Sequence, residues 1–153
     1  MSFHGFFALA LVAAAFLTSG QKPIKCKHEN PQAGPSYRVG WHDYNVEGPQ
    51  TLFLAISIRD RRFSKDEMIG LAHSLKQDFC NEQRLNVAIL DNYKAARAFS
   101  PTNEKQWFHA HWRGQYLLDR ASGKEEISFS TAPDKPKDEV KINFSPTNDK
   151  HEP

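Results

Sequence analysis

The sequence predicts an α+β fold, in which a mixed sheet of four or five strands carries one or two helices. Two observations support this prediction. First, an apolar strand, a capped amphipathic helix and a second apolar strand follow one another between residues 51 and 90, which indicates a βαβ unit with parallel strands. Second, apolar and polar residues alternate on both sides of a Ser-Gly turn between residues 108 and 130, which predicts a C-terminal β-hairpin.

Within the βαβ unit, the segment TLFLAISI at 51–58 is apolar on both faces, as expected for a central strand. Ser64 and Glu67 have the spacing of a capping box, which predicts a helix over about 65–80. One stripe of this helix is apolar and is formed by Met68, Ala72, Leu75 and Phe79.

The elements around this helix are shorter. RLNVAIL at 84–90 reads as the second strand, and NYKAARAF at 92–99 as a short helix that starts at Asp91 or Asn92. YRVGWHDYNV at 37–46 is interpreted as an edge strand.

The hairpin has two faces. Trp112, Gly114 and Tyr116 alternate along the first strand and share a face with Ile127 and Phe129 of the second. We therefore expect these residues, Trp112 included, to lie in the core, with Gly114 leaving room for an aromatic ring. The polar face of the same strand carries His109, His111, Arg113 and Gln115.

The N-terminus predicts export. Residues 5–17 are almost entirely apolar, but they are shorter than the roughly 20 residues that cross a hydrocarbon core. We interpret residues 1–20 as a signal peptide cleaved before Gln21, with an uncleaved anchor as the alternative. No second apolar stretch is long enough to span a membrane, so the mature chain is predicted to be secreted or periplasmic.

The remaining chain divides by composition. Residues 21–36 read as a linker, 37–131 as a single α+β domain and 132–153 as a flexible tail. Within the tail, Val140, Ile142 and Phe144 alternate like a short strand. The segment FSPTN occurs twice, at 99–103 and at 144–148, and the sequence offers no physical reason for the repeat.

Cys26 and Cys80 are the two cysteines of the chain. In an exported protein, two cysteines with no others in the chain favour a disulfide. In the chain-entropy model, this bond would stabilise the folded state by roughly 4 kcal/mol. The alternative is a pair of unrelated free thiols.

The formal net charge is +2, which is close to neutral and argues against a dedicated nucleic-acid binder.

A candidate anion site follows the strand at 51–58. Its residues are Arg59, Arg61, Arg62, Ser64 and Lys65. They stand where a strand ends and a helix begins, and ligands of open α/β sheets gather at that edge. The alternative is a solvated loop whose arginines pair with Asp60, Asp66 and Glu67.

A candidate metal site is the pair His109 and His111, whose side chains lie on one face of the predicted strand. Zinc requires three or four ligands, and the sequence does not identify a third. The alternative is that both histidines belong to the polar face of the hairpin. His73 flanks the apolar stripe of the helix and reads as a structural residue.

These observations predict a non-catalytic binding domain without a cofactor. Its partner would be another macromolecule or a small anion. The rival prediction is a metal-dependent or hydrolytic enzyme that uses His109 and His111.

Overall fold

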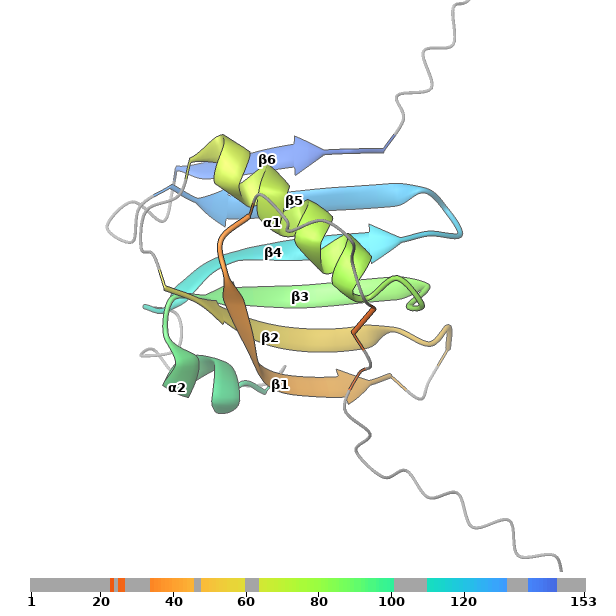
Figure 1. Cartoon of the computed structure of the whole chain (residues 1–153), viewed down its shortest axis with the longest axis horizontal. Helices are drawn as coiled ribbons and strands as arrows, with labels where there is room; N and C mark the ends of the chain where they lie inside the picture. Colours follow the sequence, from red (N-terminus) through yellow and green to blue (C-terminus); the bar gives the residue numbers. More distant parts are fainter. Residues whose placement is uncertain are drawn as a thin grey trace, which may run out of the picture.

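The computed structural model describes residues 23, 25–26, 34–45, 48–59, 64–100, 110–131 and 138–145. They form an α+β domain with one six-stranded mixed sheet and two helices (Figure 1). The spatial order of the strands follows their order in the chain. The strands are β1 (Tyr37–Tyr44), β2 (Leu52–Ile58), β3 (Arg84–Leu90), β4 (Trp112–Asp119), β5 (Lys124–Ser130) and β6 (Glu139–Asn143).

The predicted βαβ unit is confirmed. Strands β2 and β3 pair in parallel, and the chain between them forms helix α1 (Lys65–Asp78). All other neighbouring strands pair antiparallel. The predicted capping box is also present, because the Ser64 side chain accepts a hydrogen bond from the Glu67 amide, and Glu67 reaches back to the Ser64 amide.

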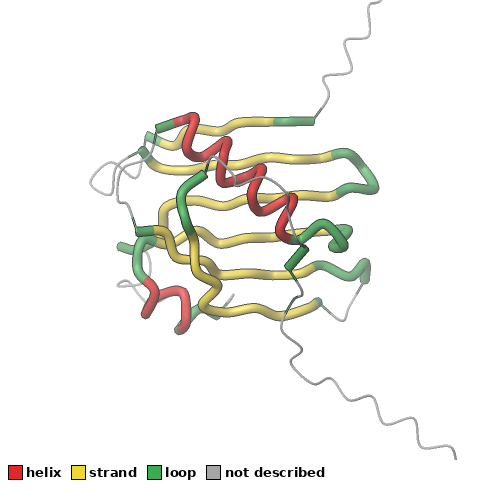
Figure 2. Tube along the Cα trace, viewed as in Figure 1, coloured by secondary structure: helices red, strands yellow, loops and turns green. Residues whose placement is uncertain are grey.

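The two helices pack on opposite faces of the sheet. Figure 2 shows α1 lying across the face that is turned to the viewer. Helix α1 covers the larger core, where its apolar stripe meets every second residue of β2, β3, β4 and β5. Helix α2 (Tyr93–Arg97) covers a smaller cluster on the other face. The smaller cluster contains Ala55, Ala88, Leu90, Ala95 and Ala96, with Trp41, Phe99 and Trp112 packed against it.

The hairpin of β4 and β5 has the predicted parity over most of its length. Tyr116 pairs with Ile127 and Gly114 with Phe129, and these residues lie in the larger core or border it. A Cβ atom on Gly114 would come within 2.8 Å of the Phe129 Cα, so this position requires glycine.

The predicted core position of Trp112 is wrong. The pairing of β3 with β4 shifts register between Ile89 and Leu90, so that Leu90 pairs with Trp112 while Ile89 pairs with Gly114. This β-bulge places Trp112 on the α2 face, where it is half-buried in the smaller cluster. Alternation along one strand does not indicate such a bulge.

The prediction of four or five strands was too low, because residues 139–143 of the predicted tail form a sixth strand. Strand β6 pairs with β5, and Val140 and Ile142 pack against the larger core as their alternation suggested. The sheet therefore ends at β6, beyond the predicted hairpin.

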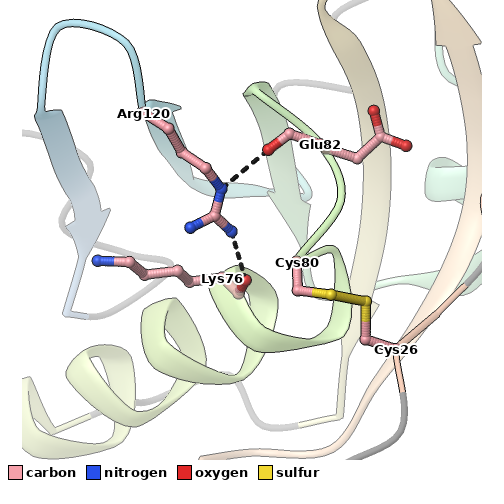
Figure 3. Close-up of a disulfide and its surroundings, with 5 residues drawn as sticks. All are labelled: Cys26, Lys76, Cys80, Glu82 and Arg120. Carbon is pink, nitrogen blue, oxygen red and sulfur yellow. Dashed lines mark hydrogen bonds between the residues drawn. A yellow bond between two sulfur atoms is a disulfide. The ribbon is translucent and has the colours of Figure 1, made fainter.

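The predicted disulfide is confirmed: Cys26 and Cys80 are bonded, with their Cα atoms 6.1 Å apart (Figure 3). The bond ties the segment before β1 to the end of α1, where the Cys26 amide also donates to the Asp78 carbonyl at 2.8 Å. A structural disulfide is typical of an oxidising compartment, either extracellular or periplasmic. None of the helices in the described residues is both long and apolar enough to cross a membrane.

Candidate functional site

The carboxyl ends of the parallel strands β2 and β3 meet at one edge of the sheet (Figure 1). Arg59 follows β2 and is exposed, and Ser64 and Lys65 are exposed at the start of α1. Arg61 and Arg62 lie outside the described residues. The anion site predicted for this loop therefore stays a prediction.

The helix start at this edge already holds a carboxylate. The Ser64 amide donates to Glu67 Oε2 at 2.7 Å, and the Ser64 hydroxyl donates to the same oxygen at 3.0 Å. These two hydrogen bonds, the one from the backbone first, lower the pKa of Glu67 below its usual range. Ser64 thus serves the helix cap, and an incoming anion would compete with Glu67 for it.

Asp91 follows β3 at the same edge and is the centre of a buried polar cluster. Its carboxylate accepts from Arg113 Nε at 2.7 Å and lies 2.7 Å from His111 Nδ1. Side-chain exposure is 2% for Asp91, 5% for Arg113 and 27% for His111. The cluster therefore places two almost completely buried charged groups next to one partly exposed imidazole.

The β-bulge in β4 makes this cluster possible. Arg113 is the extra residue opposite Ile89 and Leu90, and its guanidinium also donates to the carbonyls of Ala110 and Trp112. The Asp91 amide donates to the His111 carbonyl at 3.0 Å. These bonds fasten the start of β4 to the end of β3.

Among the described residues, the structure adds no third ligand to the predicted metal site of His109 and His111. His109 lies outside the described residues, and His111 is directed at Asp91. Among the residues the structure places, no three His, Cys, Asp or Glu side chains form a group that could hold a metal ion. The proposed pair stays a prediction.

A cationic surface lies over α2, and sequence reasoning did not identify it. We call Arg38, Tyr93, Lys94 and Arg97 the α2 surface. Tyr93, Lys94, Arg97 and Ala98 line a hollow of about 300 Å³. The guanidinium carbon of Arg38, from β1, lies 3.8 Å from the centroid of the Tyr93 ring.

Close backbone packing positions this surface. Asn92 caps α2 by accepting a hydrogen bond from the Ala95 amide at 3.1 Å, and the small residues Ala95 and Ala96 are fully buried. A Cβ atom on Gly40 would lie 2.5 Å from the Ala96 carbonyl carbon, so glycine lets β1 approach α2. Arg38 stands two residues before this contact and thereby reaches Tyr93.

The charges of the α2 surface are not neutralised within the part of the chain that the structure describes. There, Arg38, Lys94 and Arg97 form no ion pair with a carboxylate, although all three are exposed. Some cations elsewhere on the sheet have partners across the strands. Arg84 lies 3.1 Å from Asp119, and Lys141 lies 3.0 Å from Glu126.

A second hollow, of about 420 Å³, lies beside the disulfide and is lined by His73, Lys76, Gln77, Cys80 and Arg120. Figure 3 shows Lys76, Cys80 and Arg120 of this set. Its cations have structural partners. Arg120 donates to the carbonyls of Glu82 and Lys76 at 2.9 and 2.7 Å, and Lys76 pairs with Glu125 at 2.5 Å. Arg120 therefore caps the end of α1, as a cation at a helix C-terminus should.

The fold and these surfaces define an α+β domain with a disulfide-anchored N-terminal segment and a cationic α2 surface. Comparison of the chain with protein-family models, with curated proteins and with solved structures found no match.

Proposed function

We propose that the protein is an exported binding domain, without catalytic activity of its own, that docks an acidic partner on the α2 surface. The observation that carries this proposal is the gathering of Arg38, Lys94 and Arg97 around Tyr93 without a carboxylate partner in the described residues. An acidic group from a partner would supply the missing counter-charge.

The residue types support a docking role. Arginine and tyrosine are enriched among the residues that dominate binding energy at protein interfaces, because they combine a large flat surface with directed hydrogen bonds. Arg38 and Tyr93 are already stacked, so less side-chain freedom is lost when a partner binds. Exposed charges of one sign also steer an oppositely charged partner and make binding depend on salt.

Export is the second half of the proposal. The Cys26–Cys80 disulfide is typical of oxidising compartments, and the apolar segment at 5–17 has the length of a signal-peptide core. Expression of the full chain in a secreting host should release a protein that begins at Gln21. Recovery of the chain only in the membrane fraction, with its N-terminus intact, would support the uncleaved anchor instead.

The binding half is tested by retention on immobilised heparin, a sulfated polysaccharide, in a salt gradient. We expect the triple variant Arg38→Gln, Lys94→Gln, Arg97→Gln to elute at much lower salt than the native protein. The matched control is Arg59→Gln, Arg61→Gln, Arg62→Gln, which removes the same charge from the β2–α1 loop. Greater loss of retention in the loop variant would refute the α2 surface and support the anion site predicted from sequence.

A second candidate function is acid–base catalysis, and the contact between Asp91 and His111 favours it. A carboxylate 2.7 Å from Nδ1 holds the proton on that nitrogen and directs the basic lone pair of the ring to Nε2. Pairs of this kind orient the general base in many hydrolases.

This second candidate is tested with activated esters and with zinc. Hydrolysis of p-nitrophenyl acetate above the buffer rate, lost in both His111→Gln and Asp91→Asn, would support the enzyme. Sub-micromolar zinc binding that is lost in His109→Ala, His111→Ala would support its metal-dependent form. If the domain only binds, both assays give the same result for native protein and variants.

A further inference from the structure

We infer that the hollow beside Tyr93 is a discrete site for one phosphate or sulfate group, held by Lys94 and Arg97 with Arg38 completing the charge. This inference rests on the proposed function and names the chemistry that the α2 surface recognises. It distinguishes a single bound oxyanion from a diffuse attraction between surface charges.

The charge of the site favours a dianion. Lys94 and Arg97 lie three residues apart on α2 and are therefore neighbours on one face of the helix. Like charges at this spacing repel each other, which opposes a helix of five residues, although their place in the last turn suits the helix dipole. A phosphate monoester carries a charge of roughly −1.5 to −2, so it neutralises the charge of these cations more completely than one carboxylate does.

The donor types also fit a tetrahedral oxyanion. The guanidinium of Arg97 presents N–H groups in a planar fork that matches two oxygens of a phosphate or sulfate. The ammonium of Lys94 acts as a point charge that can approach a third oxygen. Both side chains line the same hollow, so one anion can contact both.

Tyr93 lines the hollow, and Arg38, which is not part of the lining, holds the Tyr93 ring in place from β1. The guanidinium of Arg38 stacks on the Tyr93 ring at 3.8 Å, and this cation–π contact holds both groups in one arrangement. Tyr93 follows the Asn92 cap directly, and the cap and the buried alanines fix the backbone beneath it. The Tyr93 ring and the backbone that carries Lys94 and Arg97 are therefore fixed before the oxyanion binds.

The size of the hollow suggests what carries the oxyanion. A volume of about 300 Å³ is at the lower end of ordinary ligand pockets. It accommodates a phosphate or sulfate together with part of the group that bears it, such as one sugar ring. A free inorganic anion and an ester on a larger molecule share the same binding chemistry, and the experiment must separate them.

The experiment follows the amide signals of residues 93–98 by NMR while sodium sulfate, sodium phosphate or glucose 6-phosphate is added at constant ionic strength. Sodium acetate is the control anion. We expect one saturable site for sulfate and phosphate, and tighter binding of glucose 6-phosphate if an ester is the natural ligand. Equal affinity for inorganic phosphate and glucose 6-phosphate would instead indicate a site for the free anion.

Single variants decide which residues hold the anion. Lys94→Gln and Arg97→Gln should each weaken sulfate binding roughly tenfold, because each removes a charge-assisted hydrogen bond. The control Arg59→Gln should leave the affinity unchanged. Circular dichroism of each variant checks that the fold is intact, which we expect because both side chains are exposed.

Two outcomes overturn the inference in different ways. Heparin retention that depends on the α2 surface, together with no saturable shift by sulfate, would refute the discrete site and leave the proposed function standing. Absence of both effects would refute the inference and the proposed function together.

Discussion

Arg113 Nε donates to the Asp91 carboxylate at 2.7 Å, and both side chains are almost completely buried. The remaining guanidinium nitrogens donate to the carbonyls of Ala110 and Trp112, at 2.9 and 2.6 Å. One arginine therefore neutralises a buried acid and satisfies two backbone carbonyls at the edge of the sheet, beside the start of α2. Substitution of Arg113 should therefore lower stability more than loss of any exposed ion pair among the described residues.

We predict that Arg113→Gln lowers the free energy of unfolding by roughly 3–5 kcal/mol, because it leaves the Asp91 charge buried and unpaired. Arg84→Gln is the control, since Arg84 and Asp119 are partly exposed and such pairs contribute about 1 kcal/mol or less. Urea unfolding of the two variants measures the difference. Equal small losses would mean that the Asp91–Arg113 pair contributes no more than a surface pair.

The second prediction concerns the two aromatic residues that sequence alternation placed on one face. Phe129 is 1% exposed in the larger core, so Phe129→Ala should cost roughly 3–5 kcal/mol. Trp112 is half-buried on the α2 face, so Trp112→Ala should cost less. Chemical unfolding decides the order. A larger loss for Trp112 than for Phe129 would contradict the register shift between β3 and β4.

Local patterns were sufficient to predict most of the fold. The capping box of Ser64 and Glu67 and the apolar stripe of α1 depend on neighbours within a few residues, so one sequence contains the whole signal. The parallel pairing of β2 and β3 follows from the helix between them. The pairing of β6 depends instead on contacts with distant residues, and its weak alternation could not distinguish an edge strand from a tail.

The sites were harder to predict for the same reason. Arg38 contacts Tyr93 because Gly40 lets β1 pack against α2. Neither contact can be predicted from a short stretch of sequence, because the two elements are far apart in the chain. Arg113 meets Asp91 because of a β-bulge. The available signal was Lys94 and Arg97 on one face of a helix that itself contains no acidic residue, and this signal does not indicate the surroundings of the two charges.

The structure also gives the repeated FSPTN segment a partial explanation. The first copy begins with Phe99 just after α2, and the second with Phe144 just after β6. Phe99 packs against the smaller cluster and Phe144 against the larger core, so each phenylalanine anchors the chain as it leaves an element. Residues 101–105 and 146–150 lie outside the described residues.

The third prediction concerns the disulfide. Cys26→Ser, Cys80→Ser should lower the free energy of unfolding by roughly 4 kcal/mol, because the bond closes a loop across 54 positions and restricts the unfolded chain. Denaturant unfolding of the double variant measures this loss. Intact mass after alkylation, with and without reductant, checks the bond in freshly secreted protein. Two alkylated thiols without reductant would show that the protein is exported reduced.

The last prediction concerns the pH dependence of the α1 cap. The hydrogen bond from the Ser64 amide, followed by that from the Ser64 hydroxyl, lowers the pKa of Glu67 in the folded protein below its ordinary value of 4.5. The unfolded state therefore binds the proton more readily, and ionised Glu67 contributes stability at pH values above 4.5. This contribution is lost as the pH falls through the lowered pKa of the folded state. Glu67→Gln isolates the effect, because glutamine keeps the hydrogen-bonding shape of a capping box but does not titrate. Urea unfolding between about pH 6 and pH 2 should show the native protein losing its advantage over the variant as the pH falls. A stability difference that stays constant across this range would show that the charge of Glu67 does not contribute to the cap.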